Sequence, residues 1–263
     1  MRLSDAVVLV TGSGQGIGRA IAVSAARQGA RVVVNSRKQA NLQEVLDEIA
    51  AAGGQAIGVE ANLRDADAVD ALMARAAEAY GRIDLLVNNA AGLFFAKAED
   101  ISPNGWRTVI DTNLTTAFLC SRAVFPYFVQ QGGGRILNVS SVAADHPHPG
   151  GAHYAAAKAA MNSLTQTLAV EWAPYGIQVN GVAPGAVLTT GSRFTDPGER
   201  AKVEAELPGG HIAEADEIAE VVLSVATTAT SYLNGETVRV DGAHRAPLQR
   251  SSVQTTRHGG KDA

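Results

Sequence analysis

Apolar runs of strand length alternate with longer helical patterns along most of this chain. The runs are continuously apolar rather than alternating, which is typical of strands covered on both faces of a parallel sheet. The expected strands are Ala6–Val10, Arg31–Asn35, Gln55–Val59, Leu85–Asn88, Arg135–Val139, Gln178–Ala183 and Thr237–Val240. The expected helices, most of which stop near a glycine, are Gly16–Gln28, Gln39–Ala52, Asp65–Tyr80, Pro103–Gln131, Ala152–Pro174 and Glu214–Thr227. Repeated strand–helix units predict a single doubly wound (Rossmann) α/β domain, whose seven-stranded parallel sheet has helices on both faces.

Two segments break the alternation. Residues 188–210 contain several glycines and prolines over a stretch too long for a routine connection, so we interpret them as a mobile flap. Residues 244–263 are rich in Ser, Thr, Gln and Arg, a composition that predicts a poorly ordered polar tail. The sequence therefore predicts one folded domain over residues 1–243, which includes the flap, followed by the tail.

Composition narrows the class of protein. The net charge of −4 argues against a nucleic-acid partner, which would favour a basic face. No run approaches the roughly 18 apolar residues of a membrane span, and the first residues lack a secretory signal. The single cysteine, Cys120, lies in an apolar helical pattern and is expected to be a packed thiol. We therefore expect a soluble, cytoplasmic protein with no membrane partner.

The segment Thr11-Gly12-Ser13-Gly14-Gln15-Gly16-Ile17-Gly18 is a glycine-rich turn between an expected strand and an expected helix. In that position, backbone N–H groups can approach a pyrophosphate closely while the helix N-terminus faces its negative charge. A glycine triplet alone is a weak signal. Here three further motifs follow at compatible spacings, so the turn predicts a dinucleotide site.

The end of the second expected strand indicates which dinucleotide is bound. An acidic residue about 20 positions past the glycines would bind a ribose 2′-hydroxyl, whereas an arginine accommodates a 2′-phosphate. This chain has Ser36 and Arg37 there, and no carboxylate before Glu44. NADP(H) is therefore favoured, and NAD(H) is the alternative.

Three residues predict the chemistry: Ser141, Tyr154 and Lys158. Tyr154 and Lys158 are four residues apart in an expected helix and so share a face. A nearby ammonium, together with the positive ring of an oxidised nicotinamide, is expected to lower the pKa of a tyrosine towards the working range. Ser141 follows an expected strand and can donate a hydrogen bond to a substrate oxygen that gains charge.

Taken together, these motifs resemble the short-chain dehydrogenase/reductase family from about Leu3 to Gly242. The family's TGxxxGxG loop matches Thr11, Gly12, Gly16 and Gly18, and its catalytic residues match Asn113, Ser141, Tyr154 and Lys158. The resemblance implies that residues 1–243 form a dinucleotide-binding catalytic domain in which residues 188–210 close over the substrate. It implies these cofactor contacts: Gly12, Ser13, Gln15, Gly16, Ile17, Gly18, Ser36, Arg37, Asn62, Leu63, Asn89, Ala90, Ala91, Tyr154, Lys158, Pro184, Gly185, Val187 and Thr189.

Three positions depart from the family pattern. Ala91 replaces a usual glycine, Asn62 replaces a frequent aspartate, and Gln15 stands where many NADP-preferring members have a basic residue. The last departure leaves the NADP(H) prediction dependent on Ser36 and Arg37.

The resemblance implies reduction of a carbonyl, a ketone or 3-oxoacyl-type group, by hydride transfer with Tyr154 as acid/base. An enoyl thioester reductase is the alternative, because Asn88–Phe94, Ile101–Pro103 and Glu171-Trp172 are similar to the enoyl- and dienoyl-CoA reductase branch. Members of that branch often lack the tyrosine, which is present here. A non-catalytic nucleotide-binding regulator is a remote alternative, since the catalytic set is complete.

Three histidines precede Tyr154 closely: His146, His148 and His153. Two prolines keep this segment extended and the reaction needs no metal, so we predict no metal site and expect the histidines to line the substrate pocket. Trp106 and Trp172 lie on apolar helical faces and are interpreted as core or interface residues. Small residues from Ala155 to Ala160 allow close helix packing, and the family resemblance implies a homodimer or homotetramer.

Overall fold

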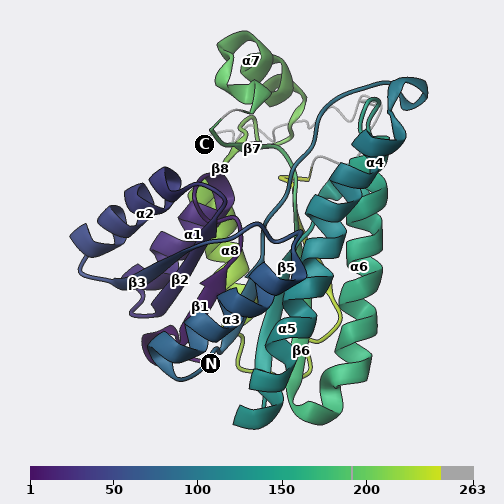
Figure 1. Cartoon of the computed structure of the whole chain (residues 1–263). Coiled ribbons are helices and arrows are strands. Elements are labelled where there is room, and N and C mark those ends of the chain that lie inside the picture. The colour runs from purple at the N-terminus through teal and green to yellow at the C-terminus, as the bar shows by residue number, and fades with distance from the viewer. Residues whose placement is uncertain (191, 244–263) are drawn as a thin grey trace, which may run out of the picture.

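The first strand of the chain lies inside the sheet, between the second and the fourth. In this computed structural model, which describes residues 1–190 and 192–243, seven strands pair in the order β3-β2-β1-β4-β5-β6-β9, all in parallel (Figure 1). They are β1 (Val7–Val10), β2 (Arg31–Ser36), β3 (Gln55–Glu60), β4 (Leu85–Asn88), β5 (Gly134–Val139), β6 (Ile177–Pro184) and β9 (Thr237–Val240). The predicted doubly wound sheet is confirmed, and each strand ends within one residue of its expected bounds.

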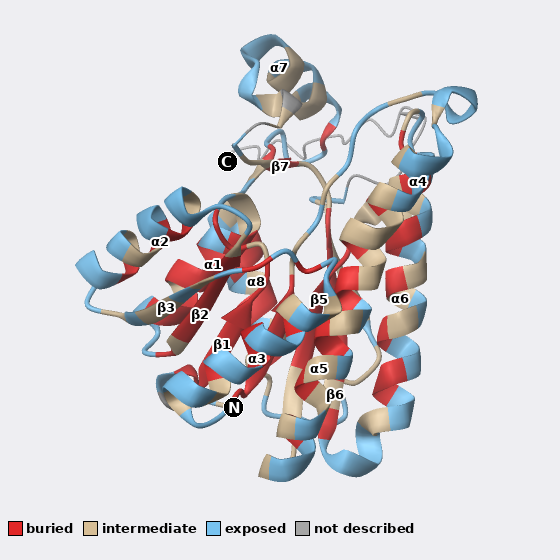
Figure 2. Cartoon of the chain, viewed as in Figure 1, coloured by how far each residue is buried: buried red, intermediate tan, exposed pale blue. Residues whose placement is uncertain are grey.

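Helices cover both faces of this sheet, and Figure 2 shows the inner strands, such as β1 and β2, buried between them. They are α1 (Gly16–Arg27), α2 (Gln39–Ala51), α3 (Ala66–Tyr80), α4 (Pro103–Ile110), α5 (Thr116–Gln131), α6 (Ala152–Trp172), α7 (Pro197–Glu206) and α8 (Ala215–Thr227). One apolar core joins α1, α2 and α8 to the sheet, and a second joins α3, α5 and α6 to the other face. Along β1, Val8 and Val10 belong to the first core while Val7 and Leu9 belong to the second, which explains the unbroken apolar run.

Shorter elements connect these helices and strands. Among the described residues, the single-turn segments are η1 (Leu3–Asp5), η2 (Ala98–Asp100), η3 (Asp111–Thr115), η4 (Val142–Ala144), η5 (Ala173–Tyr175) and η6 (Arg193–Thr195). The helix expected over Pro103–Gln131 is not continuous, because η3 is a π-helical turn between α4 and α5. The expected helix end at Pro174 is also wrong, since α6 stops at Trp172 and continues as the 3₁₀ turn η5.

The segment expected to be an irregular flap contains a helix, α7, which is a correction to the sequence analysis. Its first turn is capped by Asp196, whose carboxylate accepts the N–H of Glu199 at 2.8 Å, and Pro197 follows the cap. None of its residues is buried, so it shows no apolar periodicity. On either side, β7 (Val187–Leu188) and β8 (Ala213–Glu214) form a separate parallel pair. Gly191 and the tail over residues 244–263 lie outside the described residues.

The lone cysteine and the two tryptophans occupy different environments. Cys120 is buried in the second core, where desolvation raises the pKa of its thiol to about 12, so the predicted packed thiol is confirmed. Trp172 packs against Phe125 with ring centroids 4.9 Å apart, whereas Trp106 is 42% exposed and is not a core residue. In the described part of the chain, no helix combines the length and apolar character needed to cross a bilayer.

Candidate active site

A cavity of about 700 Å³ opens at the carboxyl ends of β1, β2 and β4. The chain changes direction along the sheet between β1 and β4, and ligands of doubly wound proteins bind in the crevice at such a switch point. The cavity is lined by Gly12, Gly14, Gln15, Gly16, Ile17, Gly18, Asn35, Ser36, Arg37, Lys38, Asn41, Ala61, Asn62, Leu63, Arg64, Asn89, Ala90, Ala91, Thr112, Thr116, Thr189 and Thr190.

The glycines of the turn between β1 and α1 are required by space and by backbone geometry. Gly12 has φ +60°, and a Cβ there would lie 2.8 Å from the Cα of Ala90. A Cβ on Gly18 would lie 2.6 Å from the carbonyl oxygen of Gly12. Any side chain at these two positions would displace the turn, which leaves backbone N–H groups at the mouth of α1 open to a ligand.

This turn is hydrogen-bonded to the two strands that flank β1, namely β2 and β4. The hydroxyl of Thr11 accepts the backbone N–H groups of Asn89 and Ala90 at 3.0 and 3.1 Å, and the Asn89 amide donates to the carbonyl of Gly12 at 3.1 Å. From β2, the Asn35 side chain accepts the N–H of Gly12 at 3.2 Å. The cradle is therefore fixed to β2 and β4 before any ligand binds.

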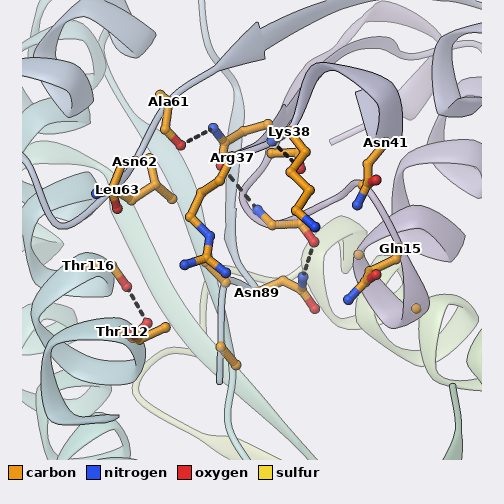
Figure 3. A pocket seen from close by; sticks show the side chains of 18 of the residues that line it. Gln15, Arg37, Lys38, Asn41, Ala61, Asn62, Leu63, Asn89, Thr112 and Thr116 are labelled. Carbon is orange, nitrogen blue, oxygen red and sulfur yellow. Dashed lines mark hydrogen bonds between the residues drawn. The ribbon is translucent and has the colours of Figure 1, made fainter. Parts of the chain in front are cut away.

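Basic side chains gather where β2 ends. Arg37, Lys38 and Arg64 line the cavity, and none of the described lining residues is acidic. Figure 3 shows Arg37 extending through the cavity, with Asn62 and Leu63 to one side and Gln15 and Asn41 to the other. This half of the cavity is therefore suited to an anionic group.

Most of the expected cofactor residues lie around the cavity, and six do not line it: Ser13, Tyr154, Lys158, Pro184, Gly185 and Val187. Ser13 is fully buried behind the turn, where its hydroxyl donates to the carbonyl of Val10 at 2.8 Å. The cavity is also lined by residues that were not among the expected contacts: Gly14, Asn35, Lys38, Asn41, Ala61, Arg64, Thr112, Thr116 and Thr190. A polar residue at the buried end of a strand, as at Asn35, was the signal that could have revealed one of them.

Strand β5 and helix α6 bring the three expected chemical residues together. Ser141 follows β5, and its hydroxyl hydrogen-bonds to the Tyr154 phenol in the first turns of α6. The Lys158 ammonium lies 5.6 Å from the centroid of the Tyr154 ring and donates to the carbonyl oxygen of Val139 at 2.8 Å. The spacing of four residues does place the tyrosine and the lysine on one face of the helix.

Burial dominates the protonation of this pair. It raises the pKa of the Tyr154 phenol, an effect that the hydrogen bond from Ser141 partly offsets. It also lowers the pKa of the Lys158 ammonium from 10.5 to about 7. The chain's own groups therefore do not produce the expected lowering of the tyrosine pKa, because desolvation outweighs the hydrogen bond from Ser141.

Asn113 lies in the π-helical turn η3 and is completely buried. Its amide nitrogen donates to the carbonyl oxygens of Gly92 and Val109 at 2.6 and 2.9 Å, while its Oδ1 has no hydrogen-bond partner. A buried amide oxygen without a partner is unfavourable by about 1–3 kcal/mol, so it marks a position for a donor such as water. This asparagine thus lies where the helix expected over Pro103–Gln131 is interrupted.

The three histidines before Tyr154 are not equivalent. His146 and His148 are exposed, while His153 is completely buried and its Nε2 has no hydrogen-bond partner. In the described part of the chain, no group of three or more His, Cys, Asp or Glu side chains could hold a metal ion.

A doubly wound parallel sheet with a glycine cradle at its switch point, together with a paired tyrosine and lysine on α6, defines a dinucleotide-dependent oxidoreductase. The family model described as short chain dehydrogenase matches residues 6–199, and this chain belongs to that family.

Relatives with known names cover almost the whole chain. It is 40% identical over 247 residues to a 3-oxoacyl-[acyl-carrier-protein] reductase of Synechocystis sp., which covers 91% of this chain and 97% of the relative. It is 37% identical over 240 residues to a probable 2,4-dienoyl-CoA reductase of Bacillus subtilis, which covers 89% of this chain and 94% of the relative. The crystal structure of a short-chain type dehydrogenase/reductase from Mycobacterium marinum superposes with a TM-score of 0.87 at 33% identity, over 93% of this chain and 97% of that one.

Proposed function

We propose that this oxidoreductase uses NADPH to reduce a carbonyl, a ketone or 3-oxoacyl-type group, to an alcohol. The observation that carries the proposal is the cluster of Ser141, Tyr154 and Lys158 past the carboxyl end of β5, the edge of the parallel sheet at which the glycine-cradled cavity also opens. Carbonyl reduction requires a proton donor and groups that stabilise a developing oxyanion. This cluster offers a phenol as the donor, with a hydroxyl and an amine to stabilise the charge. The 3-oxoacyl reductase among the relatives is named for such a reaction.

The cavity fits a phosphorylated dinucleotide. Glycines at positions 12 and 18 keep the turn in its shape, because Cβ atoms there would clash with Ala90 and with the turn itself, and that shape leaves backbone N–H groups open to a pyrophosphate. Ser36, Arg37 and Lys38 then offer a hydroxyl and two cations to a ribose 2′-phosphate, with no carboxylate among the described lining residues to repel it. These groups favour NADPH over NADH.

When bound, the dinucleotide supplies the hydride that reduces the carbonyl carbon. In the proposed reaction the Tyr154 phenol gives its proton to the substrate oxygen, and the Ser141 hydroxyl donates a hydrogen bond to the same oxygen. Lys158 favours the phenolate that remains and holds the nicotinamide ribose. Asn113 supports the lysine through water at its unpartnered Oδ1. Of the other expected contacts, Thr189 lines the cavity and Val187 lies close by in β7.

The proposal is tested by following the oxidation of NADPH and of NADH with a panel of ketones, 3-oxoacyl thioesters and 2-enoyl thioesters. We expect alcohol formation from a carbonyl substrate, with NADPH preferred by at least about tenfold, as a charge-assisted contact of about 1.4 kcal/mol implies. Activity with enoyl thioesters alone would overturn the carbonyl assignment. Equal use of NADH would overturn the cofactor assignment.

Enoyl thioester reduction is the second candidate. It is favoured by the similarity to the probable dienoyl-CoA reductase, whose name states that substrate class. Tyr154 is present and contacts both of its expected partners, which supports carbonyl chemistry instead. A regulator without turnover would have no need of this set of contacts.

We also propose that the protein assembles into a homodimer or homotetramer. Helices α5 and α6 expose apolar side chains, with Phe118, Val129 and Val170 at 43%, 41% and 78% exposure. Ala156 and Ala159 on α6 are exposed and small enough to let a second helix approach. Light scattering of the purified protein tests this directly, and a monomer at micromolar concentration would contradict it. The cytoplasmic location expected from the sequence remains a prediction.

A further inference from the structure

The loop between β4 and α4 exposes three consecutive apolar side chains. Leu93, Phe94 and Phe95 are 44%, 40% and 59% exposed, and Figure 2 shows the loop as a largely exposed segment above the sheet. Large apolar side chains that stand together in water usually mark a binding surface. The question is what this surface binds.

The ring of Phe94 packs against two elements of the protein, α6 and α4. Its ring meets the buried imidazole of His153 edge-on, with centroids 4.5 Å apart at 82°. On the side of α4, a Cβ on Gly105 would come within 2.9 Å of the ring, so a glycine is needed there to admit it. The ring therefore has a defined seat between α4 and α6, with its remaining surface facing solvent.

Phe95 is held in a similar way by the segment that precedes α6. Its ring lies 5.5 Å from that of His148, and the N–H of Ala96 donates to the carbonyl of Gly150 at 3.2 Å. A Cβ on Gly151 would lie 2.6 Å from the His148 ring, so here too a glycine makes room. We call Phe94, Phe95, His148 and His153 the ring platform.

The ring platform adjoins the proposed catalytic residues. His153 directly precedes Tyr154 in α6, and the carbonyl of Gly92, at the start of the loop, accepts a hydrogen bond from Asn113 at 2.6 Å. The exposed rings of Phe94 and Phe95 therefore belong to a loop that is joined directly to the elements of the proposed catalytic residues.

The ring platform is also uncharged where it is buried. Desolvation lowers the pKa of His153, so its imidazole is neutral at neutral pH. The loop beyond the rings carries Lys97 against Glu99 and Asp100, which gives no excess of positive charge for a phosphorylated carrier. Flat, neutral and unsaturated rings are the groups that such a surface binds through offset and edge-to-face contacts.

We propose that the ring platform selects ketones whose carbonyl is attached to a flat aromatic ring. This inference rests on the proposed function, because it places the ring beside Tyr154 as the proton donor.

The test compares acetophenone with cyclohexyl methyl ketone, which have the same number of carbons and differ in the flatness of the ring. Their dissociation constants are measured by calorimetry in the presence of NADP⁺, which prevents turnover. We expect the wild-type protein to bind acetophenone about three- to tenfold more tightly, as one aromatic contact implies. Phe95→Leu should bring the ratio close to one, and Phe95→Tyr should restore it.

Tyr232→Leu is the matched control. Tyr232 is 98% exposed and belongs to the segment 228–236. That segment accepts hydrogen bonds from Gln178 at the start of β6, so it lies at the amino ends of the strands, away from the ring platform. Its ratio should equal that of the wild type. Equal or weaker binding of acetophenone to the wild type, or an unchanged ratio in Phe95→Leu, would overturn the proposal.

The proposed function is judged separately, by NADPH oxidation with the same two ketones. If neither these ketones nor any 3-oxoacyl thioester is reduced but the ring preference in binding holds, the carbonyl reaction is wrong and the ring platform stands. If both are reduced with no preference in binding, the ring platform is wrong and the proposed function stands.

Discussion

The ammonium of Lys158 donates a hydrogen bond to the carbonyl oxygen of Val139 at 2.8 Å, which ties α6 to the last residue of β5. One carbonyl does not replace the water that this completely buried amine gives up, and burial lowers its pKa to about 7. The residue is therefore unfavourable for folding in its charged form, although it is proposed to act in that form.

Lys158→Met should stabilise the protein at neutral pH. It should also remove the part of the pH dependence of the unfolding free energy that comes from this amine. Between about pH 7 and 10.5 the unfolded chain keeps the lysine proton that the folded protein loses, so stability contributed by this group rises with pH. The free energy of unfolding of the wild type, relative to Lys158→Met, should rise by ~2–3 kcal/mol from pH 7 to 9.5 in urea denaturation. Lys202→Met, at an exposed position on α7, is the control and should give a constant difference.

Tyr154→Phe should lower kcat by about a thousandfold while leaving the affinity for NADPH within about twofold, because a general acid contributes about 10²–10⁴-fold and the ring itself is kept. Steady-state kinetics and fluorescence titration measure the two quantities. Tyr175→Phe, at a half-exposed position just beyond α6, is the matched control and should be fully active. Retention of most activity by Tyr154→Phe would contradict the proposed acid.

Arg37→Ala should weaken NADPH binding by about 10- to 100-fold and NADH binding by less than about threefold, since a charge-assisted contact to a 2′-phosphate is worth about 1.5–3 kcal/mol. Fluorescence titration with both dinucleotides measures the difference. Arg75→Ala removes an exposed arginine of α3 that pairs with Glu78, and it should change neither affinity. If Arg37→Ala lowered the affinity for both dinucleotides by the same factor, the arginine would not bind the 2′-phosphate specifically.

Thr165→Val should destabilise the protein by ~1–3 kcal/mol. The hydroxyl of Thr165 on α6 accepts a hydrogen bond from the side-chain amide nitrogen of Asn138 at 2.9 Å. The amide oxygen of Asn138 accepts in turn from the side-chain nitrogen of Asn88 at 2.9 Å, and all three residues are buried. Valine leaves a buried donor without its partner. Urea denaturation measures the loss, and Thr165→Ser should recover most of it.

Thr227→Val is the control for that change. Both threonines donate to the carbonyl four residues earlier, at 2.9 Å for Thr165 and 2.7 Å for Thr227. Thr227 is half-buried on α8, outside the asparagine network, so its loss should be less than half as large. Equal losses would mean that the network adds nothing.

The inner strands of this fold could be predicted from the sequence because both of their faces are buried. In β1, Val7 and Val8 point to opposite cores and neither is exposed, so no polar residue interrupts the run. Helix α7 could not be predicted in this way, because it buries none of its residues and its ends are set by local capping alone. Only the signals at Asp196 and Pro197 were available.

The residues of the candidate site also fall into two groups, those that the sequence could indicate and those that it could not. Residues in motifs of fixed spacing, such as Tyr154 and Lys158, could be assigned from the sequence since a helix repeats regularly. Thr112 and Thr116 could not be assigned to the cavity, because their place in its lining depends on how the π-helical turn between α4 and α5 packs in the folded protein. The raised pKa of Tyr154 also could not be foreseen, since burial is a property of the packed protein.

The position of β9 at the border of the sheet has a consequence for synthesis on the ribosome. Its partner β6 ends at Pro184, and residues 237–240 that complete the pairing emerge more than fifty positions later. Until then, the hydrogen-bonding groups of β6 remain available to other nascent chains. A product that terminates prematurely after α8 would thus already contain the glycine cradle and yet be prone to aggregation.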